Sequence, residues 1–235
     1  MKSIIVLSML VNILFAFSTK YFPFKIQYHC DRILHKTAFD ICYSCKKKEP
    51  DFVTYTLYGN LVDKNNYSRK GLSFRPDYNL PKKCRSYSKD YVHSGYDRGH
   101  NAENASLDYS RKVQKETFLM SNISPQAKWL NRKYWSKVER FSRYLAVKYG
   151  KVNIITGSCG SIGHLKNNVN IPKWWYKIIY IPKFHKFVGF LVPNINKGMK
   201  SAKLKEYMVP VEKIEKICNF KILRQKKEES LFKRI

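Results

Sequence analysis

A histidine, several arginines, two asparagines and a glutamate in the middle of the chain have the residue types and spacing of a phosphodiester-cleaving site. Residues 97–100 read Asp-Arg-Gly-His, and the candidate residues of this region are Arg98, His100, Asn122, Asn131, Glu139 and Arg143. Hydrolysis of a phosphodiester requires a base for the attacking water, positive charge at the phosphate oxygens and stabilisation of the leaving oxygen. The imidazole, guanidinium groups and oxygen donors of this set match those three tasks.

His100 is the expected general base. An imidazole with its ordinary pKa of about 6.5 accepts a proton from water at neutral pH, and a positioned base contributes roughly 10²- to 10⁴-fold to a rate. A histidine beside a glycine, taken alone, is more often a turn residue or a buried polar residue. The neighbouring Arg98 and the downstream polar residues favour catalysis, and we expect Arg98 either to contact phosphate or to support the His100 loop.

Asn131 and Glu139 are the expected metal-site residues. Mg²⁺ prefers oxygen ligands, keeps several of its waters and is often held by one or two protein groups together with substrate phosphate. We expect the Asn131 carbonyl to bind the ion directly and Glu139 to hold a metal-bound water. The alternative for Asn131 is an ordinary solvent-facing helix residue.

Arg143 is expected to bind substrate phosphate together with Arg98, because a guanidinium offers two parallel hydrogen bonds to phosphate oxygens. Arg143 also lies four residues after Glu139. An ion pair at that helical spacing is therefore the second interpretation of this residue.

These residues lie on the clearest helix of the sequence, which we expect over residues 126–149. Its apolar side chains recur every three or four residues and are Leu130, Tyr134, Val138, Phe141, Leu145 and Tyr149. Ser124 is the expected cap, Pro125 fits the first turn and Gly150 ends the helix. A second series, at steps of four, is Asn131, Trp135, Glu139 and Arg143. Each step of four drifts by only about 40°, so this series should share one edge of the helix.

The remaining elements indicate an α+β protein. β-branched and aromatic runs predict strands over residues 52–58, 152–157, 174–181 and 187–192, and a short helix is expected within residues 206–218. Strands and helices do not alternate regularly, which argues against a parallel βαβ fold.

The charge balance points to a polyanionic partner. The chain has 235 residues, with 45 Lys and Arg against 17 Asp and Glu and a formal net charge of +28. Such a surface attracts nucleic acid, anionic lipid or acidic polysaccharide, and nucleic acid is the partner we expect. A generally solvated, lysine-rich surface is the alternative explanation of the charge, so the charge does not by itself indicate catalysis.

The chain ends differ in composition from the middle. A short positive start, an apolar run over residues 4–17 and small residues at 16 and 18 predict a signal peptide over residues 1–18, with a retained anchor as the alternative. We then expect an exposed N-terminal extension over residues 19–50, one catalytic domain over 51–222 and a charged tail over 223–235. This reading implies a secreted or periplasmic protein without stable membrane association after cleavage.

Six cysteines form an even set, which suits disulfides in an oxidising compartment. They are Cys30, Cys42, Cys45, Cys84, Cys159 and Cys218. We expect at least one bridge among the first four, although the sequence does not fix the pairing. A zinc site built from His29, Cys30, Cys42 and Cys45 is the competing interpretation.

Several separated motifs resemble the DNA/RNA non-specific endonuclease family, which includes secreted bacterial nucleases and mitochondrial endonuclease G. The matching segments, in order, are Gly-Tyr-Asp-Arg-Gly-His at 95–100, Leu-Met-Ser-Asn-Ile-Ser-Pro-Gln at 119–126, Leu130-Asn131 with Trp135 and Glu139, Ile-Thr-Gly at 155–157, residues 171–177, Val-Pro-Asn at 192–194 and residues 209–215. The likeness covers residues from about 52 to 222. After the histidine this chain reads Asn-Ala-Glu-Asn at 101–104, whereas the family usually has an apolar residue followed by Ala-Pro.

The resemblance implies a ββα-metal (His-Me finger) fold with a mixed central sheet flanked by helices. It implies His100 as proton acceptor, Asn131 as the direct ligand of Mg²⁺, with Mn²⁺ as another possible ion, and Glu139 as the residue that orders metal-bound water. By the same resemblance, Arg98 and Arg143 assist at the phosphate and Asn122 supports the site.

The expected function is therefore that of an exported, magnesium-dependent, sequence-non-specific endonuclease that hydrolyses DNA and, by the same chemistry, RNA. Two alternatives are a basic nucleic-acid-binding protein without catalysis and a phosphodiesterase for small nucleotides. The sequence does not indicate an oligomeric state.

Overall fold

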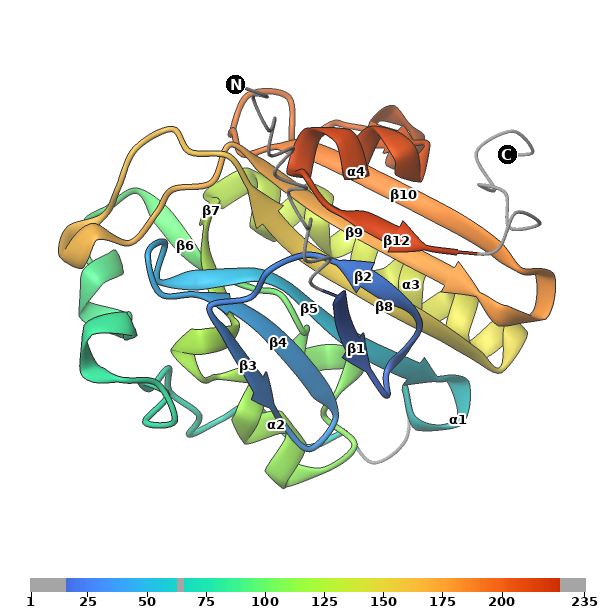
Figure 1. The fold of residues 1–235 in the computed structure, drawn as a ribbon, viewed down its shortest axis with the longest axis horizontal. Helices are drawn as coiled ribbons and strands as arrows, with labels where there is room; N and C mark the ends of the chain where they lie inside the picture. The colour runs from blue at the N-terminus through green and yellow to red at the C-terminus, as the bar shows by residue number, and fades with distance from the viewer. Residues whose placement is uncertain (1–15, 63–65, 225–235) are drawn as a thin grey trace, which may run out of the picture.

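The computed structural model describes residues 16–62 and 66–224, in which a large sheet has a long helix on one face and a small sheet with a shorter helix on the other (Figure 1). A seven-stranded antiparallel sheet has the strand order β11-β10-β9-β8-β5-β4-β3. Its strands are β3 (Arg32–His35), β4 (Phe39–Ser44), β5 (Glu49–Tyr58), β8 (Lys151–Cys159), β9 (Trp174–Ile181), β10 (Lys186–Pro193) and β11 (Met208–Val209). A three-stranded sheet consists of β1 (Ala16–Thr19), β2 (Phe22–Gln27) and β12 (Lys221–Leu223), and β6 (Tyr96–His100) pairs with β7 (Ile123–Ala127). The α+β class expected from the sequence is confirmed.

Alternating residues of the central strands fill two separate cores. Ile154 and Ile179 belong to the core beneath the long helix, whereas their neighbours Ile155 and Ile178 belong to the core on the opposite face. Side chains of a strand point alternately to its two faces, so continuous apolar runs such as that of β9 are typical of strands covered on both sides. Trp135 packs edge-on against Trp175, with ring centroids 5.4 Å apart, and connects the helix to the sheet.

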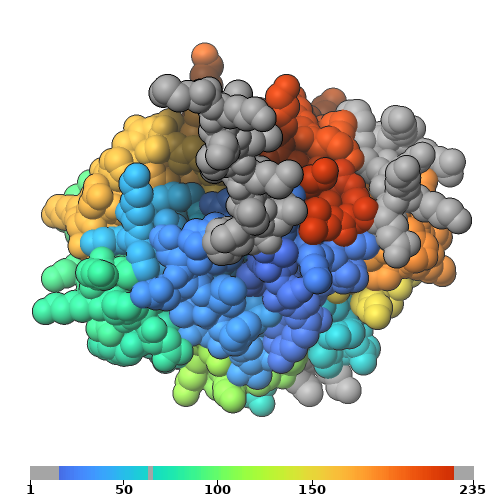
Figure 2. Space-filling view, viewed as in Figure 1, coloured from blue at the N-terminus to red at the C-terminus, as the bar shows by residue number. Residues whose placement is uncertain are grey.

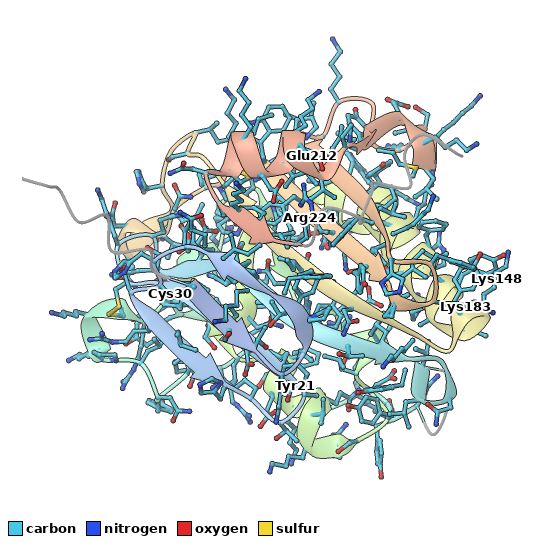
Figure 3. The ribbon with its side chains drawn as sticks, turned by 45° about the vertical axis from the view of Figure 1, so that its right-hand side comes forward. Tyr21, Cys30, Lys148, Lys183, Glu212 and Arg224 are labelled. Carbon is cyan, nitrogen blue, oxygen red and sulfur yellow. A yellow bond between two sulfur atoms is a disulfide. The ribbon has the colours of Figure 1, made fainter. Side chains whose placement is uncertain are left out.

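The helices cover the two faces unequally. The π-helical turn η5 (Leu130–Trp135) and α3 (Ser136–Tyr149) run along one face of the large sheet, while α4 (Val211–Cys218) and the three-stranded sheet cover the other (Figure 1). The short helices α1 (Gly59–Val62) and α2 (Arg111–Thr117) complete the set of α-helices in the described residues. Arg224 follows β12 and forms ion pairs with Glu212 and Glu215 of α4, which fastens this strand to the helix (Figure 3). None of the described helices is long and apolar enough to cross a bilayer.

Residues 126–149 do not form one helix, and this expectation is wrong at its start. Ser124 and Pro125, expected to begin the helix, lie in β7 and face Gly99 and Arg98 of β6. Proline has no N–H to donate and is tolerated on an edge strand, which explains its place in this two-stranded hairpin. The helix that carries the apolar side chains begins at Leu130, and its first turn is π-helical.

Residues 19–50 do not project from the fold as the expected exposed extension. They contain β2, β3 and β4, and the last two are strands of the large sheet. The segment from residue 16 forms much of one face of the molecule (Figure 2), and Phe17 is buried against Phe52 with ring centroids 5.3 Å apart. Residues 1–15 of the expected signal peptide and residues 225–235 of the expected tail lie outside the described residues.

Three disulfides use all six cysteines and exclude the zinc interpretation. The pairs are Cys30–Cys42, Cys45–Cys84 and Cys159–Cys218. The expected bridge among the first four cysteines is confirmed by two such pairs. Cys42 packs in the core beside Phe52, whereas Cys45 packs against the core on the other face of the sheet, so the Cys-x-x-Cys pair does not converge on one ion.

Candidate active site

The β6–β7 hairpin carries the Asp-Arg-Gly-His sequence and fixes the position of His100. His100 lies opposite Ile123 in the antiparallel pairing. Gly99 is packed so closely that an added Cβ would lie 2.4 Å from Gln126 Oε1 and 2.9 Å from Trp175 Cη2. A glycine at this position therefore lets the hairpin lie directly on the core, beside the catalytic candidate.

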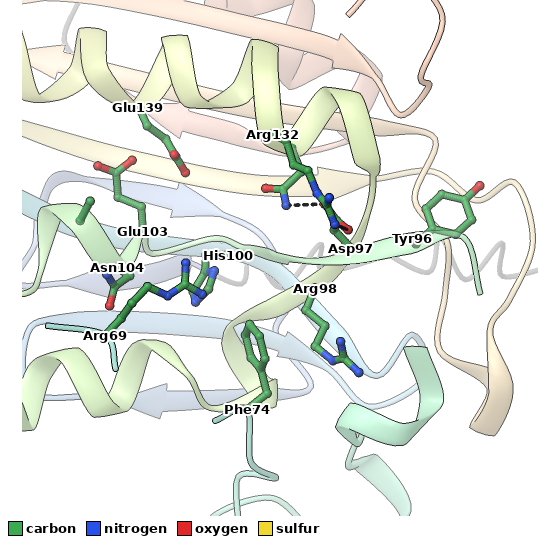
Figure 4. Close-up of a pocket in the computed structure, with 12 residues that line it drawn as sticks. Arg69, Phe74, Tyr96, Asp97, Arg98, His100, Glu103, Asn104, Arg132 and Glu139 are labelled. Carbon is green, nitrogen blue, oxygen red and sulfur yellow. Dashed lines mark hydrogen bonds and ion pairs between the residues drawn. The ribbon is translucent and has the colours of Figure 1, made fainter. Parts of the chain in front are cut away.

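A pocket of about 460 Å³ opens beside His100, between the hairpin and the η5–α3 helix (Figure 4). The residues that line it are Arg69, Phe74, Tyr96, Asp97, Arg98, His100, Glu103, Asn104, Ala105, Asn131, Arg132 and Glu139. Four of the six expected site residues lie in this pocket: Arg98, His100, Asn131 and Glu139. Asn122 and Arg143 do not line it.

The His100 ring is held between aromatic side chains. Its centroid lies 5.3 Å from that of Phe74 and 5.2 Å from that of Phe118, the latter edge-on. Its Nε2 is buried and has no hydrogen-bond partner in the described part of the protein. Burial, assisted by the positive charge of Arg69, lowers the pKa of His100 to about 3. The imidazole is therefore neutral at physiological pH and able to accept a proton.

We expect the imidazole of His100 to show no titration between about pH 5 and pH 8, where an exposed histidine would titrate near pH 6.5. The folded-state pKa is lowered, so the neutral form persists as the pH falls through the ordinary value. The measurement is the chemical shift of its Cε1 proton by NMR, assigned through its absence in His100→Gln. A midpoint near pH 6.5 would show that the ring is solvated rather than packed between Phe74 and Phe118.

Asp97 orients the carboxamide of Asn131. Asn131 Nδ2 donates to Asp97 Oδ2 at 3.0 Å, and Arg132 donates to both oxygens of the same carboxylate, each at 2.8 Å (Figure 4). Burial would raise the pKa of Asp97, but the hydrogen bonds from Arg132 and Asn131 hold it below its usual range. A carboxylate only accepts hydrogen bonds, so the nitrogen of the Asn131 amide must face Asp97 and its carbonyl oxygen is free for another partner.

The pocket fits a hard divalent cation. The Asn131 carbonyl oxygen and the carboxyl groups of Glu139 and Glu103 are oxygen donors in one polar pocket. No group of three or more His, Cys, Asp or Glu able to hold a metal occurs among residues 16–62 and 66–224. Mg²⁺ and Mn²⁺ do not require such a group, because water and substrate phosphate supply the other ligands.

Glu139 points into the pocket from α3 and interacts with Glu103. Burial, followed by the negative charge of Glu103, raises the pKa of Glu139 to about 8. Lys177 and Arg143 act in the opposite direction but do not outweigh burial and Glu103, so Glu139 holds its proton more tightly than an exposed glutamate does. Lys177 is itself buried, donates to the Tyr55 hydroxyl at 3.0 Å and lies over the Trp135 ring at 5.5 Å.

Arg143 is not placed for the phosphate contact expected from the sequence. Its Nη1 forms an ion pair with Glu103 Oε1. Within residues 16–62 and 66–224 Arg143 forms no ion pair with Glu139, which was the second interpretation of this residue. The four-residue series also does not share one edge, because Trp135 is fully buried in the core while Asn131 and Glu139 line the pocket. The π-helical turn adds a residue to the helical repeat at this point and changes the phase of the side chains.

Arg98 and Asn122 hold the loops around His100. Arg98 Nη2 donates to the Ser88 carbonyl at 2.6 Å, and Figure 4 shows its guanidinium directed away from His100. Asn122 is buried; its Nδ2 donates to the carbonyls of Ala102 and Thr117, and its Oδ1 accepts from the Ala102 N–H. These bonds fix the chain directly after His100.

Sequence reasoning missed three charged residues of the pocket: Arg69, Glu103 and Arg132. Arg69 comes from a loop 31 positions before His100, and no local pattern marks it. Arg132 could have been paired with Asp97 only through knowledge of the hairpin. Glu103 was visible as a departure from the resembled family, and that departure is the signal that could have identified it.

Comparison with known proteins supports the fold and identifies the family. Residues 19–229 match the DNA/RNA non-specific endonuclease family. The mitochondrial nuclease of Saccharomyces cerevisiae is 28% identical over 216 residues, covering 81% of this chain and 65% of that protein. The human protein named nuclease EXOG, mitochondrial, is 31% identical over 198 residues, covering 75% and 53%. A chain in the crystal structure of the EndoG/EndoGI complex superposes with a TM-score of 0.76 at 25% identity, covering 83% of this chain and 86% of that chain.

These relatives contradict the location expected from the sequence. The chain spans 53% to 65% of the length of the two curated proteins above, and both carry the word mitochondrial in their names. Human endonuclease G, mitochondrial, is likewise 27% identical over 199 residues. The expectation of a secreted or periplasmic protein is therefore wrong by this comparison.

The expected ββα-metal arrangement is confirmed by the β6–β7 hairpin, the η5–α3 helix that follows it and the likeness to EndoG. The family match extends over most of the chain and includes every residue that lines the pocket. The chain belongs to the DNA/RNA non-specific endonuclease family.

Proposed function

We propose that this chain is a magnesium-dependent endonuclease that hydrolyses phosphodiester bonds of DNA and RNA without sequence specificity. One observation carries the proposal: a neutral imidazole, His100, and a carboxamide oriented by Asp97, that of Asn131, line the same pocket. A base and a cation ligand that face one space are the two requirements of metal-assisted phosphodiester hydrolysis.

In this mechanism the neutral imidazole of His100 accepts the proton of the attacking water. Burial lowers its pKa and so weakens it as a base, and the negative charge of a bound phosphate beside Arg69 would raise that pKa again. Asn131 would hold the ion through its carbonyl oxygen, and Glu139 would hold and orient water beside it. The bound ion supplies Lewis-acid stabilisation of the negative charge that develops at the phosphate and the leaving oxygen. Asn122 and Arg98 support the loops that position His100.

The phosphate contact is assigned to Arg69 in place of Arg143. Arg69 is exposed, lines the pocket and lies close enough to His100 to lower its pKa. Its guanidinium is over the Phe118 ring at 5.3 Å, a contact that directs it without neutralising its charge. Arg143, in contrast, is already paired with Glu103.

The lack of sequence specificity follows from binding through basic side chains to phosphate groups. A net charge of +28 binds the phosphate backbone, and contacts to phosphate carry no information on base identity. Affinity should therefore fall steeply as the salt concentration rises.

The test incubates the purified chain with supercoiled plasmid, with single-stranded RNA and with a dinucleotide, in Mg²⁺ and in excess chelator. We expect cleavage of both polymers that requires the ion, and little hydrolysis of the dinucleotide. Binding without cleavage would support a non-catalytic nucleic-acid-binding protein instead. Faster hydrolysis of the dinucleotide than of plasmid would support a small-nucleotide phosphodiesterase.

A further inference from the structure

Glu103 is a buried carboxylate three residues after His100 that reaches the pocket. It is 2% exposed, and it is one of the residues that line the pocket. Its Oε1 accepts hydrogen bonds from Arg143 and Ser106. Its Oε2 is buried and has no hydrogen-bond partner of its own in the described part of the chain. One oxygen of this carboxylate is therefore fixed by the protein, and the other has no donor.

The carboxyl group of Glu103 lies beside that of Glu139. Figure 4 shows the two carboxyl groups facing each other across one end of the pocket, one from the loop after β6 and one from α3. Two carboxylates at such close range repel each other in a poorly solvated site. A divalent cation between them would remove the repulsion and provide the partner that Glu103 Oε2 lacks.

The positive side chains near these carboxylates, Arg143 and Lys177, do not line the pocket. Arg143 contacts the Glu103 oxygen that is already hydrogen-bonded. Lys177 points from β9 and donates to the Tyr55 hydroxyl. No salt bridge joins Glu139 to a cationic side chain within residues 16–62 and 66–224. Arg143 thus offsets part of the negative charge of Glu103, while Glu103 and Glu139 both line the pocket.

We propose that Glu103 is a second carboxylate of the ion site, so that a divalent cation held by the carbonyl of Asn131 would have Glu103 as a further oxygen ligand, with Glu139 holding water beside it. This inference rests on the proposed function, because it concerns the same ion. One or two carboxylates are the usual protein share of a Mg²⁺ or Mn²⁺ site, and affinity rises with the number of charged ligands. Arg143 is then an ion-pair partner that offsets the charge of Glu103 and not a phosphate contact.

The test measures Mn²⁺ binding directly, by calorimetry on the full chain without nucleic acid. His100→Ala serves as the parent, so that no turnover enters the measurement. We expect Glu103→Gln to weaken Mn²⁺ binding by about 10- to 100-fold. Arg143→Gln breaks the same ion pair but keeps the carboxylate, and it should not weaken the binding. Glu116→Gln, which removes the charge of a half-buried carboxylate that accepts hydrogen bonds from Thr37 outside the pocket, is the matched control for a lost negative charge.

The inference would be overturned if Glu103→Gln did not weaken Mn²⁺ binding, or if Arg143→Gln weakened it equally. Glu103 would then be a partner of Arg143 only. If Glu103→Gln does not fold, as judged from its thermal unfolding, Glu103→Asp replaces it. The shorter carboxylate should then bind Mn²⁺ more weakly than the parent, and unchanged affinity would contradict the role. If the parent binds no Mn²⁺ at all, the proposed metal dependence fails as well, which separates that failure from loss of the Glu103 role alone.

Discussion

His100→Ala is expected to lower the rate of DNA cleavage by about 10²- to 10⁴-fold, the usual contribution of a positioned general base. The imidazole is the proposed proton acceptor and lines the pocket, and an alanine provides no group to replace it. DNA affinity should be unchanged, because phosphate binding comes from basic side chains elsewhere. Single-turnover cleavage of plasmid measures the rate, and fluorescence anisotropy with a labelled duplex measures binding.

The controls separate chemistry from packing. His164→Ala removes an exposed histidine outside the pocket and should cleave at the rate of the unmodified chain. His100→Ala also leaves space between Phe74 and Phe118, so added imidazole should restore part of the lost rate. Undiminished turnover in His100→Ala would refute the assigned base.

Elements with a strong local pattern were predictable from the sequence. The strand expected over residues 174–181 has those same bounds in the structure, and the helix ends before Gly150 as expected. Each depends on short-range features, namely an apolar run that fits a strand covered on both faces and a glycine with positive φ after the last turn. The Asp-Arg-Gly-His sequence and Asn131 were found for a similar reason, because their residue types are unusual at their spacing.

Features that depend on distant partners were not predictable. Ser124 and Pro125 read as a helix start, because their pairing with β6 is a contact across 25 positions or more. Arg143 read as a phosphate ligand or as a partner of Glu139, because nothing in a helical pattern indicates a carboxylate 40 positions earlier. Arg69 reaches the pocket from a loop, where periodicity carries no information.

Asn131→Ala is expected to lower the cleavage rate by at least about 10²-fold and to raise the ion concentration needed for half-maximal rate, because it removes a proposed ligand. Plasmid cleavage across a series of Mg²⁺ concentrations measures both effects. Lys133→Ala, on the same π-helical turn but outside the pocket, is the control for disturbance of the helix. An Asn131→Ala variant with an unchanged Mg²⁺ requirement would show that the ion is held elsewhere.

The orientation of the Asn131 amide permits a stricter test. Asn131→Asp keeps an oxygen ligand and the shape of the side chain, but it places a carboxylate 3.0 Å from that of Asp97, so cleavage should fall as it does in Asn131→Ala. The double variant Asp97→Asn with Asn131→Asp exchanges the two residues. The amide at position 97 can then donate to the carboxylate at position 131, so the contact again joins a donor and an acceptor. Because one carboxylate again remains for Arg132, we expect the exchanged variant to cleave faster than Asn131→Asp alone. Equal rates in the single and double variants would mean that Asp97 does not act by directing the Asn131 oxygen into the pocket.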